Sequence, residues 1–279
     1  MNDRETRILE ALEEQGTVTV TSLVDALAVS AVTIRKDLEA LESRRLLKRI
    51  RGGATRPSPM VEGEFPERLA VASRAKRAVA IEAAKLVIDG DTVAFDTSST
   101  AHFVAREILD RKNLVIITQS IPTAALFLEQ SDAQVIMPGG ILRRESSGLV
   151  GTRPEHLVGR GRISKGFFGV TGLSPQGGLL ELGLDESESK RVLAEACKRV
   201  YGIFASEKVD GFGFHSFCPV DRVTALITDS GIAPEDVKQW TDLGVPVTIA
   251  DITDHDNDRG ASAPTTAGHE PSTQHKENK

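Results

Sequence analysis

The side chains best placed to do chemistry are hydrogen-bond donors in one short segment, Val29–Leu38. Thr33, Arg35 and Lys36 bring a hydroxyl, a guanidinium and an ammonium within about one turn of a helix. Such donors bind the edges of bases in the major groove of DNA, and basic side chains also bind phosphates. We therefore expect these three residues to read bases.

A helix with a defined start and a fixed buried face must position these donors. Ser30 can accept a hydrogen bond from a free backbone N–H of the first turn, so we expect the helix to begin near Ala31. Its buried stripe is predicted from apolar residues that recur at helical spacing, namely Ile34, Leu38 and Leu41. Two amphipathic helices are predicted ahead of it, at Arg7–Gln15 and Thr21–Ala28. This order of helices is typical of a helix-turn-helix module.

A short basic hairpin is predicted directly after the third helix. Lys48, Arg49 and Arg51 alternate with apolar residues ahead of a turn at Gly52-Gly53. Each part alone has an ordinary explanation, because amphipathic helices with basic outer faces are common and most charge runs are merely solvated. Their order at the start of the chain favours a winged helix-turn-helix that binds double-stranded DNA.

Residues 3–58 resemble the winged helix-turn-helix of the DeoR family of bacterial transcriptional regulators. The family pattern is present without a gap in Val29, Ser30, Thr33, Ile34, Arg35, Asp37, Leu38, Leu46, Leu47, Arg49, Gly52, Gly53 and Ala54. The resemblance implies that operator DNA is a partner. The expected DNA contacts are Ser30, Thr33, Arg35, Lys36, Arg49, Arg51 and Gly52.

The net charge of the chain does not argue against a DNA partner. The 279 residues carry a formal net charge of −6, but attraction to DNA depends on local charge. Between Ser30 and Arg56 the acidic residues are Asp37, Glu39 and Glu42. The basic residues of the same segment are Arg35, Lys36, Arg44, Arg45, Lys48, Arg49, Arg51 and Arg56.

Composition also indicates the compartment. Cys197 and Cys218 are too few for a disulfide framework, and the N-terminus lacks the apolar core of a signal peptide. No apolar run approaches the roughly 20 residues that span a bilayer. We expect a cytoplasmic protein without a membrane role.

A second domain is expected at residues 67–252, after a connector at 59–66 that is rich in proline. It begins with a predicted helix at Glu67–Ile88, and helices then alternate with short apolar strands. The predicted strands are Thr92–Phe95, Leu114–Ile117, Ala133–Met137, Gly166–Val170, Val200–Phe204, Ala225–Thr228 and Val245–Ile249. This alternation is typical of an α/β domain with a mostly parallel sheet. Residues 253–279 show no apolar periodicity and predict a disordered tail.

Loops rich in hydroxyl groups or glycine follow the first three predicted strands. Open α/β sheets bind their ligands at the carboxyl ends of strands. In the first loop, Asp96–Thr100, free backbone N–H groups and hydroxyls can converge on an anion such as phosphate. The second is Thr118–Ser120, and the third, Pro138–Gly140, permits close backbone approach to a ligand. Helix caps and turns are the commoner use of any one such loop, but three in succession favour a binding site.

Residues Phe65 to Asp251 resemble the DeoR-type sensor domain, whose fold is related to ribose-5-phosphate isomerase and glucosamine-phosphate deaminase. The resemblance implies a phosphorylated sugar or related metabolite as effector. The implied effector contacts are Asp96, Ser98, Ser99, Thr100, Ser120, Gly139, Gly140, Lys190 and Lys208. Within this set Lys208 would supply charge. Lys190 is the weaker candidate, because an exposed lysine on a helix is usually a solvated charge.

Three positions depart from the family pattern. Ser98 stands where the family usually has glycine, Gln119 where it usually has asparagine, and Ala205 where an aspartate often precedes the lysine at 208. A serine at position 98 is expected to narrow the phosphate cradle, which leaves the identity of the effector open.

A sugar-phosphate isomerase or deaminase is the main alternative function. Such an enzyme needs a carboxylate base near a substrate C–H, and the loop Thr171–Gly178 contains no Asp or Glu. An architectural DNA-binding protein would leave the glycine and hydroxyl loops unexplained. We therefore expect a transcriptional regulator that represses a carbohydrate-metabolism operon, since repression is the usual outcome in the family that the chain resembles. It is expected to act as a dimer or tetramer, without catalytic residues, metal or cofactor.

Overall fold

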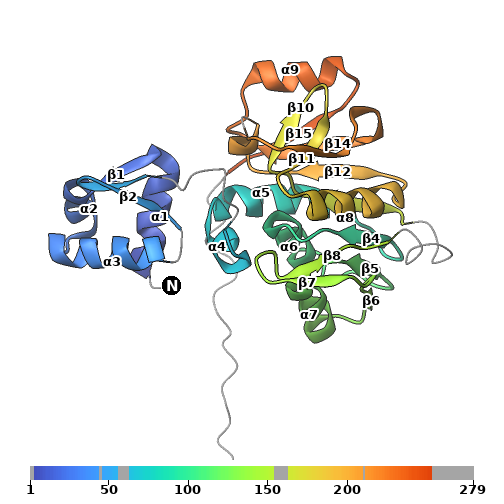
Figure 1. Cartoon of the computed structure of the whole chain (residues 1–279), viewed down its shortest axis with the longest axis horizontal. Helices are drawn as coiled ribbons and strands as arrows, with labels where there is room; N and C mark the ends of the chain where they lie inside the picture. Colours follow the sequence, from blue (N-terminus) through green and yellow to red (C-terminus); the bar gives the residue numbers. More distant parts are fainter. Residues whose placement is uncertain (1–2, 44–45, 56–62, 154–162, 210, 253–279) are drawn as a thin grey trace, which may run out of the picture.

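The structure, a computed structural model, describes residues 3–43, 46–55, 63–153, 163–209 and 211–252. Residues 59–62 of the predicted connector, the predicted tail at 253–279 and the basic residues Arg44, Arg45 and Arg56 lie outside this range. Figure 1 shows a small N-terminal part and a larger part built around a sheet.

The described N-terminal part contains three helices and a three-stranded antiparallel sheet. The helices are α1 (Asp3–Gln15), α2 (Val20–Leu27) and α3 (Ala31–Ser43), and the strands are β1 (Thr17–Thr19), β2 (Lys48–Ile50) and β3 (Gly53–Thr55). The three helices share one apolar core, and the predicted stripe of Ile34, Leu38 and Leu41 is buried in it. The predicted order of three helices and a hairpin is thereby confirmed.

An ion pair holds α1 against α3. Arg4 donates from Nε and Nη2 to the two carboxylate oxygens of Asp37, at 2.6 and 2.9 Å. Asp37 is buried, and the Arg4 guanidinium balances its charge inside the N-terminal part.

The two glycines of the hairpin turn meet different requirements. Gly52 has a φ of +86°, a region that L side chains rarely adopt. Gly53 has no room for a side chain, because a Cβ there would overlap the carbonyl oxygen of Val18. Strand β1 makes this close approach because it pairs with β3. The sequence predicted the hairpin but not β1, which is too short to give a periodic signal.

The larger part is built on a seven-stranded sheet in the order β15-β14-β12-β9-β4-β5-β6, in which every neighbouring pair is parallel. Its strands are β4 (Thr92–Phe95), β5 (Val115–Thr118), β6 (Gln134–Ile136), β9 (Lys165–Phe168), β12 (Val200–Ile203), β14 (Ala225–Asp229) and β15 (Val247–Ala250). Each predicted strand is present, so the α/β domain with a mostly parallel sheet is confirmed.

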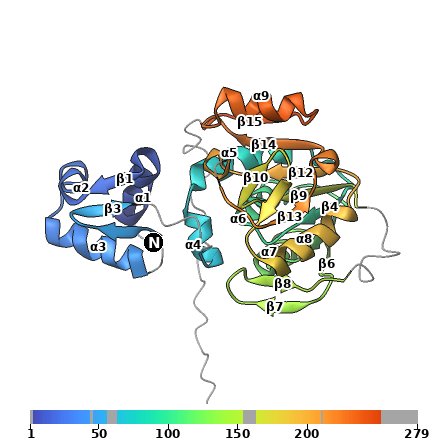
Figure 2. The same ribbon diagram turned by 45° about the horizontal axis from the view of Figure 1, so that its top comes forward.

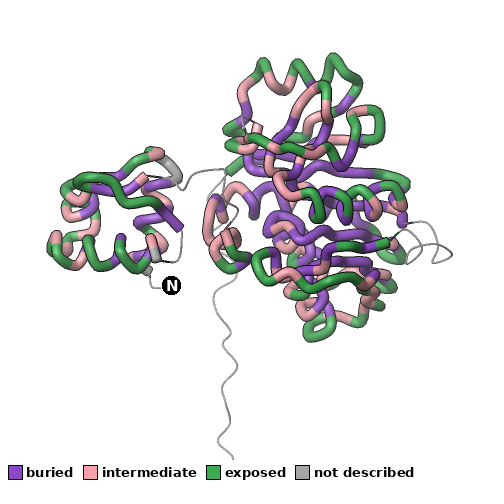
Figure 3. Tube along the Cα trace, viewed as in Figure 1, coloured by how far each residue is buried: buried purple, intermediate pink, exposed green. Residues whose placement is uncertain are grey.

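Helices cover both faces of this sheet (Figure 2). One core lies under α5 (Ser73–Ala84), α6 (Ser99–Arg106) and α7 (Ile121–Gln130), and a second lies under α8 (Leu184–Glu195) and α9 (Pro234–Asp242). Successive strand residues point to opposite faces: Phe95 and Phe167 enter the first core, whereas Ala94 and Phe168 enter the second. Figure 3 shows the buried central strands between helices with exposed outer surfaces.

Smaller elements that the sequence did not predict lie around the sheet. A second, antiparallel sheet is formed by β10 (Gly172–Ser174), β11 (Gly178–Glu181) and β13 (His215–Cys218). A hairpin is formed by β7 (Ile141–Arg143) and β8 (Gly148–Val150). The 3-10 turns η2 (Ser206–Lys208) and η3 (Val220–Arg222) precede β13 and β14.

The single helix predicted at Glu67–Ile88 is wrong. The chain forms α4 (Phe65–Ala70) and α5, and between them Ala72 adopts a left-handed φ of +50°. Lys76 donates to the carbonyl oxygens of Arg68 and Val71 at 2.5 and 2.6 Å, which satisfies groups left open where α4 ends. An alanine at the break gives no sequence signal for it.

Candidate DNA interface and effector site

Ser30 caps α3, the helix expected to read bases, as the sequence predicts. Its hydroxyl accepts a hydrogen bond from the Thr33 N–H at 3.2 Å. The Thr33 hydroxyl lies 2.9 Å from that of Ser30, so it takes part in the cap. Arg35 and Lys36 are exposed on α3 just after the cap.

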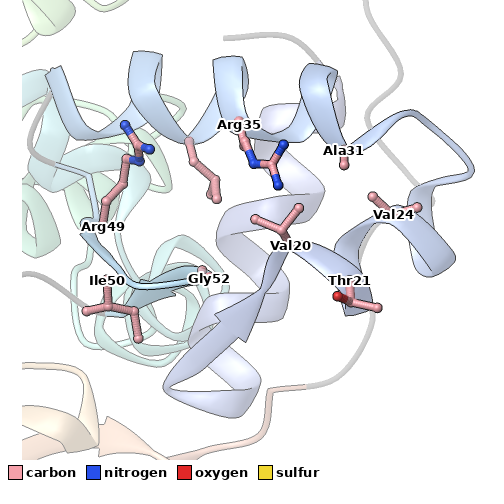
Figure 4. A pocket seen from close by; sticks show the side chains of 10 residues that line it. Val20, Thr21, Val24, Ala31, Arg35, Arg49, Ile50 and Gly52 are labelled. Carbon is pink, nitrogen blue, oxygen red and sulfur yellow. The ribbon is translucent and has the colours of Figure 1, made fainter.

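An open cleft of about 430 Å³ lies between α2, α3 and the β2–β3 hairpin. Figure 4 shows Arg35 reaching from α3 toward Val20, and Arg49 reaching from β2 toward α3. The other lining residues are Thr21, Val24, Ala31, Leu38, Ile50, Gly52 and Gly53. Both guanidinium groups therefore face a groove beside α3.

Contacts from two helices fix the hairpin. Glu42 on α3 accepts the Arg49 N–H at 2.8 Å, and its other oxygen lies 4.0 Å from the Arg49 guanidinium. The Val20 N–H donates to the Gly52 carbonyl oxygen at 2.8 Å, which ties the turn to α2. Arg51 is exposed on this turn. The hairpin thus presents Arg49 and Arg51 from a fixed position.

The second candidate site lies at the carboxyl edge of the parallel sheet, next to β4. The chain passes from β4 to β5 and β6 on one side, then crosses to β9 on the other side. Open α/β sheets bind ligands at such a switch point. The loop after β4, Asp96–Thr100, meets the start of the loop after β9, at Gly169.

Asp96 holds these two loops together. One carboxylate oxygen accepts the Ser98 N–H at 3.0 Å, and the other accepts the Gly169 N–H at 2.9 Å. The second oxygen also lies 3.0 Å from the Lys190 ammonium. Because Asp96 is fully buried and engaged on both oxygens, it positions the loop.

Lys190 is buried, so the expectation that it is an exposed lysine is wrong. Its ammonium lies 2.5 Å from Glu181 as well as 3.0 Å from Asp96, and it donates to the Gly169 carbonyl at 3.0 Å. Burial acts to raise the pKa of Glu181, but the Lys190 charge and hydrogen bond outweigh it and hold this pKa below its ordinary value. Two carboxylates surround one ammonium, which makes Lys190 an anchor for the loops.

The first turn of α6 offers backbone donors to an anion. The Ser98 hydroxyl accepts the Ala101 N–H at 3.1 Å, and its side chain occupies the space that a Cβ at Gly169 would need. Glycine at 169 therefore makes room for the serine that departs from the family pattern. The N–H groups of Ser99 and Thr100 lie in the first turn of α6, where no intrahelical acceptor is available. An anion can bind such groups.

Gln119, another departure from the family pattern, links the neighbouring loops. Its side-chain nitrogen donates to the Thr152 hydroxyl at 3.0 Å, and that hydroxyl donates to the Gly139 carbonyl at 3.2 Å. Gly139 and Gly140 have φ values of +84° and +141°, and a Cβ at Gly140 would overlap the backbone of β8. Both glycines thus shape the turn against the β7–β8 hairpin.

Ser120 and Lys208 complete the predicted set. Ser120 is buried and caps α7 by accepting the Thr123 N–H at 3.3 Å. Lys208 ends η2, just beyond the carboxyl end of β12. Among the residues that the structure describes, no hydrogen bond or ion pair engages its ammonium group. Lys208 therefore shares the edge of the sheet with the other candidates but not their contacts.

Sequence reasoning missed Glu181 and Ser146. Glu181 ends β11, a strand without a periodic signal of its own. Ser146, in the β7–β8 turn, is 3% exposed, and its hydroxyl has no hydrogen-bond partner among the described residues. Neither belongs to a motif, so only the folded chain reveals them.

Two further features concern the described segments as a whole. None of their helices is both long and apolar enough to cross a membrane. Nor do three or more His, Cys, Asp or Glu side chains gather there in a way that could hold a metal ion.

Known proteins match both parts of the chain. The DeoR-like helix-turn-helix domain matches residues 4–60, and the DeoR C terminal sensor domain matches residues 71–230. The glycerol-3-phosphate regulon repressor of Escherichia coli (strain K12) is 30% identical over 227 residues, 81% of this chain and 90% of that protein. The HTH-type transcriptional regulator GolR of Listeria innocua is 31% identical over 254 residues, 89% of this chain and 98% of that protein.

Among solved structures, ribose 5-phosphate isomerase A from Methanocaldococcus jannaschii is similar over 48% of this chain and 53% of that chain. The identity is 18% and the TM-score 0.36. The sensor-domain match alone spans more than half of the sequence, and the relatives match over nearly their whole length. The chain belongs to the DeoR family of transcriptional regulators.

Proposed function

We propose that the chain represses a carbohydrate-metabolism operon and that a phosphorylated sugar or related metabolite changes its affinity for the operator. The observation that carries the proposal is the combination of two sites in one DeoR-family chain. One is a capped basic helix beside an open cleft, and the other is a helix N-terminus at the switch point of an α/β sheet. The names of the relatives, which include a glycerol-3-phosphate regulon repressor and a putative aga operon transcriptional repressor, support it.

On the DNA side, Arg35 and Lys36 would reach base edges, because they are exposed just after the capped start of α3. Ser30 and Thr33 would hold that start in place through their shared cap. Phosphate contacts would come from the hairpin residues Arg49, Arg51 and Gly52.

On the effector side, the N–H groups of Ser99 and Thr100 would bind the phosphate, and Lys208 would neutralise part of its charge. The remaining residues would shape the pocket without being its main donors, because their polar atoms are already engaged or their backbone is constrained. They are Asp96, Ser98, Ser120, Gly139, Gly140 and Lys190.

We expect no catalysis at this edge. Isomerisation of a sugar phosphate needs a carboxylate that can take a proton from carbon. The buried carboxylates of Asp96 and Glu181 both pair with Lys190, and the low pKa of Glu181 makes it a poor base. A family of transcriptional regulators also favours a binding function.

We also propose a cytoplasmic homo-oligomer, a dimer or a tetramer. One winged helix reads few base pairs, and symmetric assemblies bind repeated half-sites. Residues 3–58 would form its DNA-binding domain and residues 67–252 its sensor domain, with 59–66 between them.

A titration with proline and alanine variants tests the effector site. The protein, bound to its own promoter at fixed salt, is exposed to a panel of sugar phosphates. Proline at the first helical position removes an N–H without breaking the helix, and the extended Ser98 backbone is compatible with a following proline. We expect Ser99→Pro to keep operator binding but lose the response, whereas Ser99→Ala, which keeps the N–H, retains it. No response of the wild type to any sugar phosphate would overturn the proposed effector.

A further inference from the structure

We propose that Arg68 is a positioning residue that couples the loop at residues 96–100 to the DNA-binding domain. Its role rests on the proposed function, since it assigns the regulation of the same effector site. Arg68 lies on α4, which both views show between the small domain and the sensor domain (Figures 1 and 2).

At the sensor end, Arg68 holds two backbone segments. Its Nη2 donates to the carbonyl oxygens of Thr97 and Ser146, at 3.4 Å each. Its guanidinium also lies 5.5 Å from the centre of the Phe65 ring, which fixes the side chain on α4. Arg68 thus forms hydrogen bonds both to the loop at residues 96–100 and to the β7–β8 turn.

Both tied segments adjoin the proposed phosphate position. Thr97 is buried and is separated only by Ser98 from Ser99 and Thr100, the residues whose N–H groups are proposed to bind the phosphate. The Thr97 side chain also lies against Gly148, at the start of β8, so the loop and the hairpin are in close contact. The unpartnered hydroxyl of Ser146 lies on the same turn. A ligand that shifts the loop, or that binds this hydroxyl, therefore changes the position of the Arg68 acceptors.

At the other end, α4 contacts both domains through successive residues. Leu69 packs against the core of the sensor domain, whereas Ala70 and Val71 pack against the core of the DNA-binding domain. Lys76 donates to the carbonyls of Arg68 and Val71, so the end of α4 is held firmly to α5. A shift at Thr97 is thus passed by Arg68 to α4, and by Ala70 and Val71 to the core that carries α3.

The test uses full-length Arg68→Ala, Arg68→Lys and Lys238→Ala proteins. Lys238 is exposed on α9, where it pairs with Asp242, and its variant controls for the loss of one positive charge. The probes are glycerol 3-phosphate, a panel of sugar phosphates and inorganic phosphate. Calorimetry measures probe affinity, and fluorescence anisotropy measures operator affinity with and without the probe.

We expect Arg68→Ala to keep probe affinity within about threefold of wild type while its operator affinity changes less than about twofold on probe addition. Arg68→Lys can still donate to one carbonyl and should keep part of the response, and Lys238→Ala should keep all of it. A full response in Arg68→Ala overturns the coupling role. So does a loss of probe affinity in step with the response, because Arg68 would then bind the ligand itself.

If no probe binds the wild type, the proposed effector is wrong, and hydrogen exchange of the ligand-free proteins decides the coupling. Arg68→Ala should speed exchange both at the amides of residues 96–100 and in α4, with the amides of α8 and α9 unchanged. Exchange at the wild-type rate in the loop and in α4 overturns the proposal.

Discussion

At the scale of single residues, Arg35 and Arg51 carry the same guanidinium in different settings. Arg35 faces the cleft beside α3, whereas Arg51 is exposed on the hairpin turn. We expect Arg35→Ala to cost roughly 1 to 3 kcal/mol of operator binding and to relax the preference at one base pair. Arg51→Ala should weaken binding to all sequences alike and flatten the salt dependence. Titrations of operator variants over a range of salt check both effects, and equal losses on every sequence would contradict base reading by Arg35.

His102 is expected to make stability depend on pH. Burial, with a smaller effect of Arg106, lowers the pKa of His102 from 6.5 to about 4. The unfolded chain therefore binds the proton more readily, and stability falls as the pH drops below 6.5 toward 4. When the pH falls from about 7 to about 5, protonation of His102 in the unfolded chain should lower the free energy of unfolding by about 2 kcal/mol.

The control for this prediction is His102→Asn. The His102 Nδ1 lies 3.2 Å from the Thr123 hydroxyl, and an asparagine can still form a hydrogen bond to this hydroxyl but does not titrate. Urea unfolding at both pH values gives the difference between the proteins. A variant that loses as much stability as the wild type would show that His102 is not responsible.

Sequence patterns revealed the residues whose role is local. Ser30 was predicted to cap the helix that follows it, and it does so, because a capping hydroxyl needs only the next turn. Ser98, predicted as an effector contact, also caps the helix that follows it, α6. Lys190 was misjudged because its partners come from other elements: Asp96 follows β4, far away in sequence, and Glu181 ends β11. The effector contacts themselves remain predictions.

At the scale of elements, Glu42 attaches the β2–β3 hairpin to α3. Its removal is therefore expected to weaken operator binding, although the loss of a negative charge alone would strengthen it. Removing a negative charge near DNA should strengthen binding, since it lowers repulsion of phosphates. Glu42→Ala also removes the acceptor that holds the Arg49 N–H at 2.8 Å, and we expect it to weaken operator binding by about 1 kcal/mol. Glu42→Gln keeps an acceptor and loses only the charge, so it should bind at least as tightly as wild type. Stronger operator binding by the alanine variant than by wild type would show that Glu42 does not position the β2–β3 hairpin.

The strands of the parallel sheet were predicted well, whereas the smaller sheet and the break between α4 and α5 were not. The parallel strands are buried on both faces and therefore read as apolar runs. Strand β11 pairs with β13, which follows only after α8 and β12 in the chain, so no local pattern marks this pairing. The break at Ala72 depends on Lys76, whose side chain replaces helical hydrogen bonds.

At the scale of the whole molecule, one coupling free energy links the operator site and the effector site. If an effector changes operator affinity by a given factor, operator DNA must change effector affinity by the same factor, typically about 5 to 150-fold. The prediction covers both sites at once, because it does not depend on which residues carry the coupling. Calorimetric titration of the effector into free protein, and into protein saturated with operator duplex, measures the second factor directly.

For each of several sugar phosphates that differ in affinity, the change in operator affinity and the change in effector affinity can be compared. Equal factors within every such pair would establish a single linked equilibrium. The Arg68→Ala protein should then bring both factors toward one together, since linkage does not permit one to fall alone. Unequal factors in wild type would mean that another equilibrium, such as a change of oligomeric state, takes part. Repeating the titrations at several protein concentrations identifies that case, because only an assembly step makes the factors depend on protein concentration.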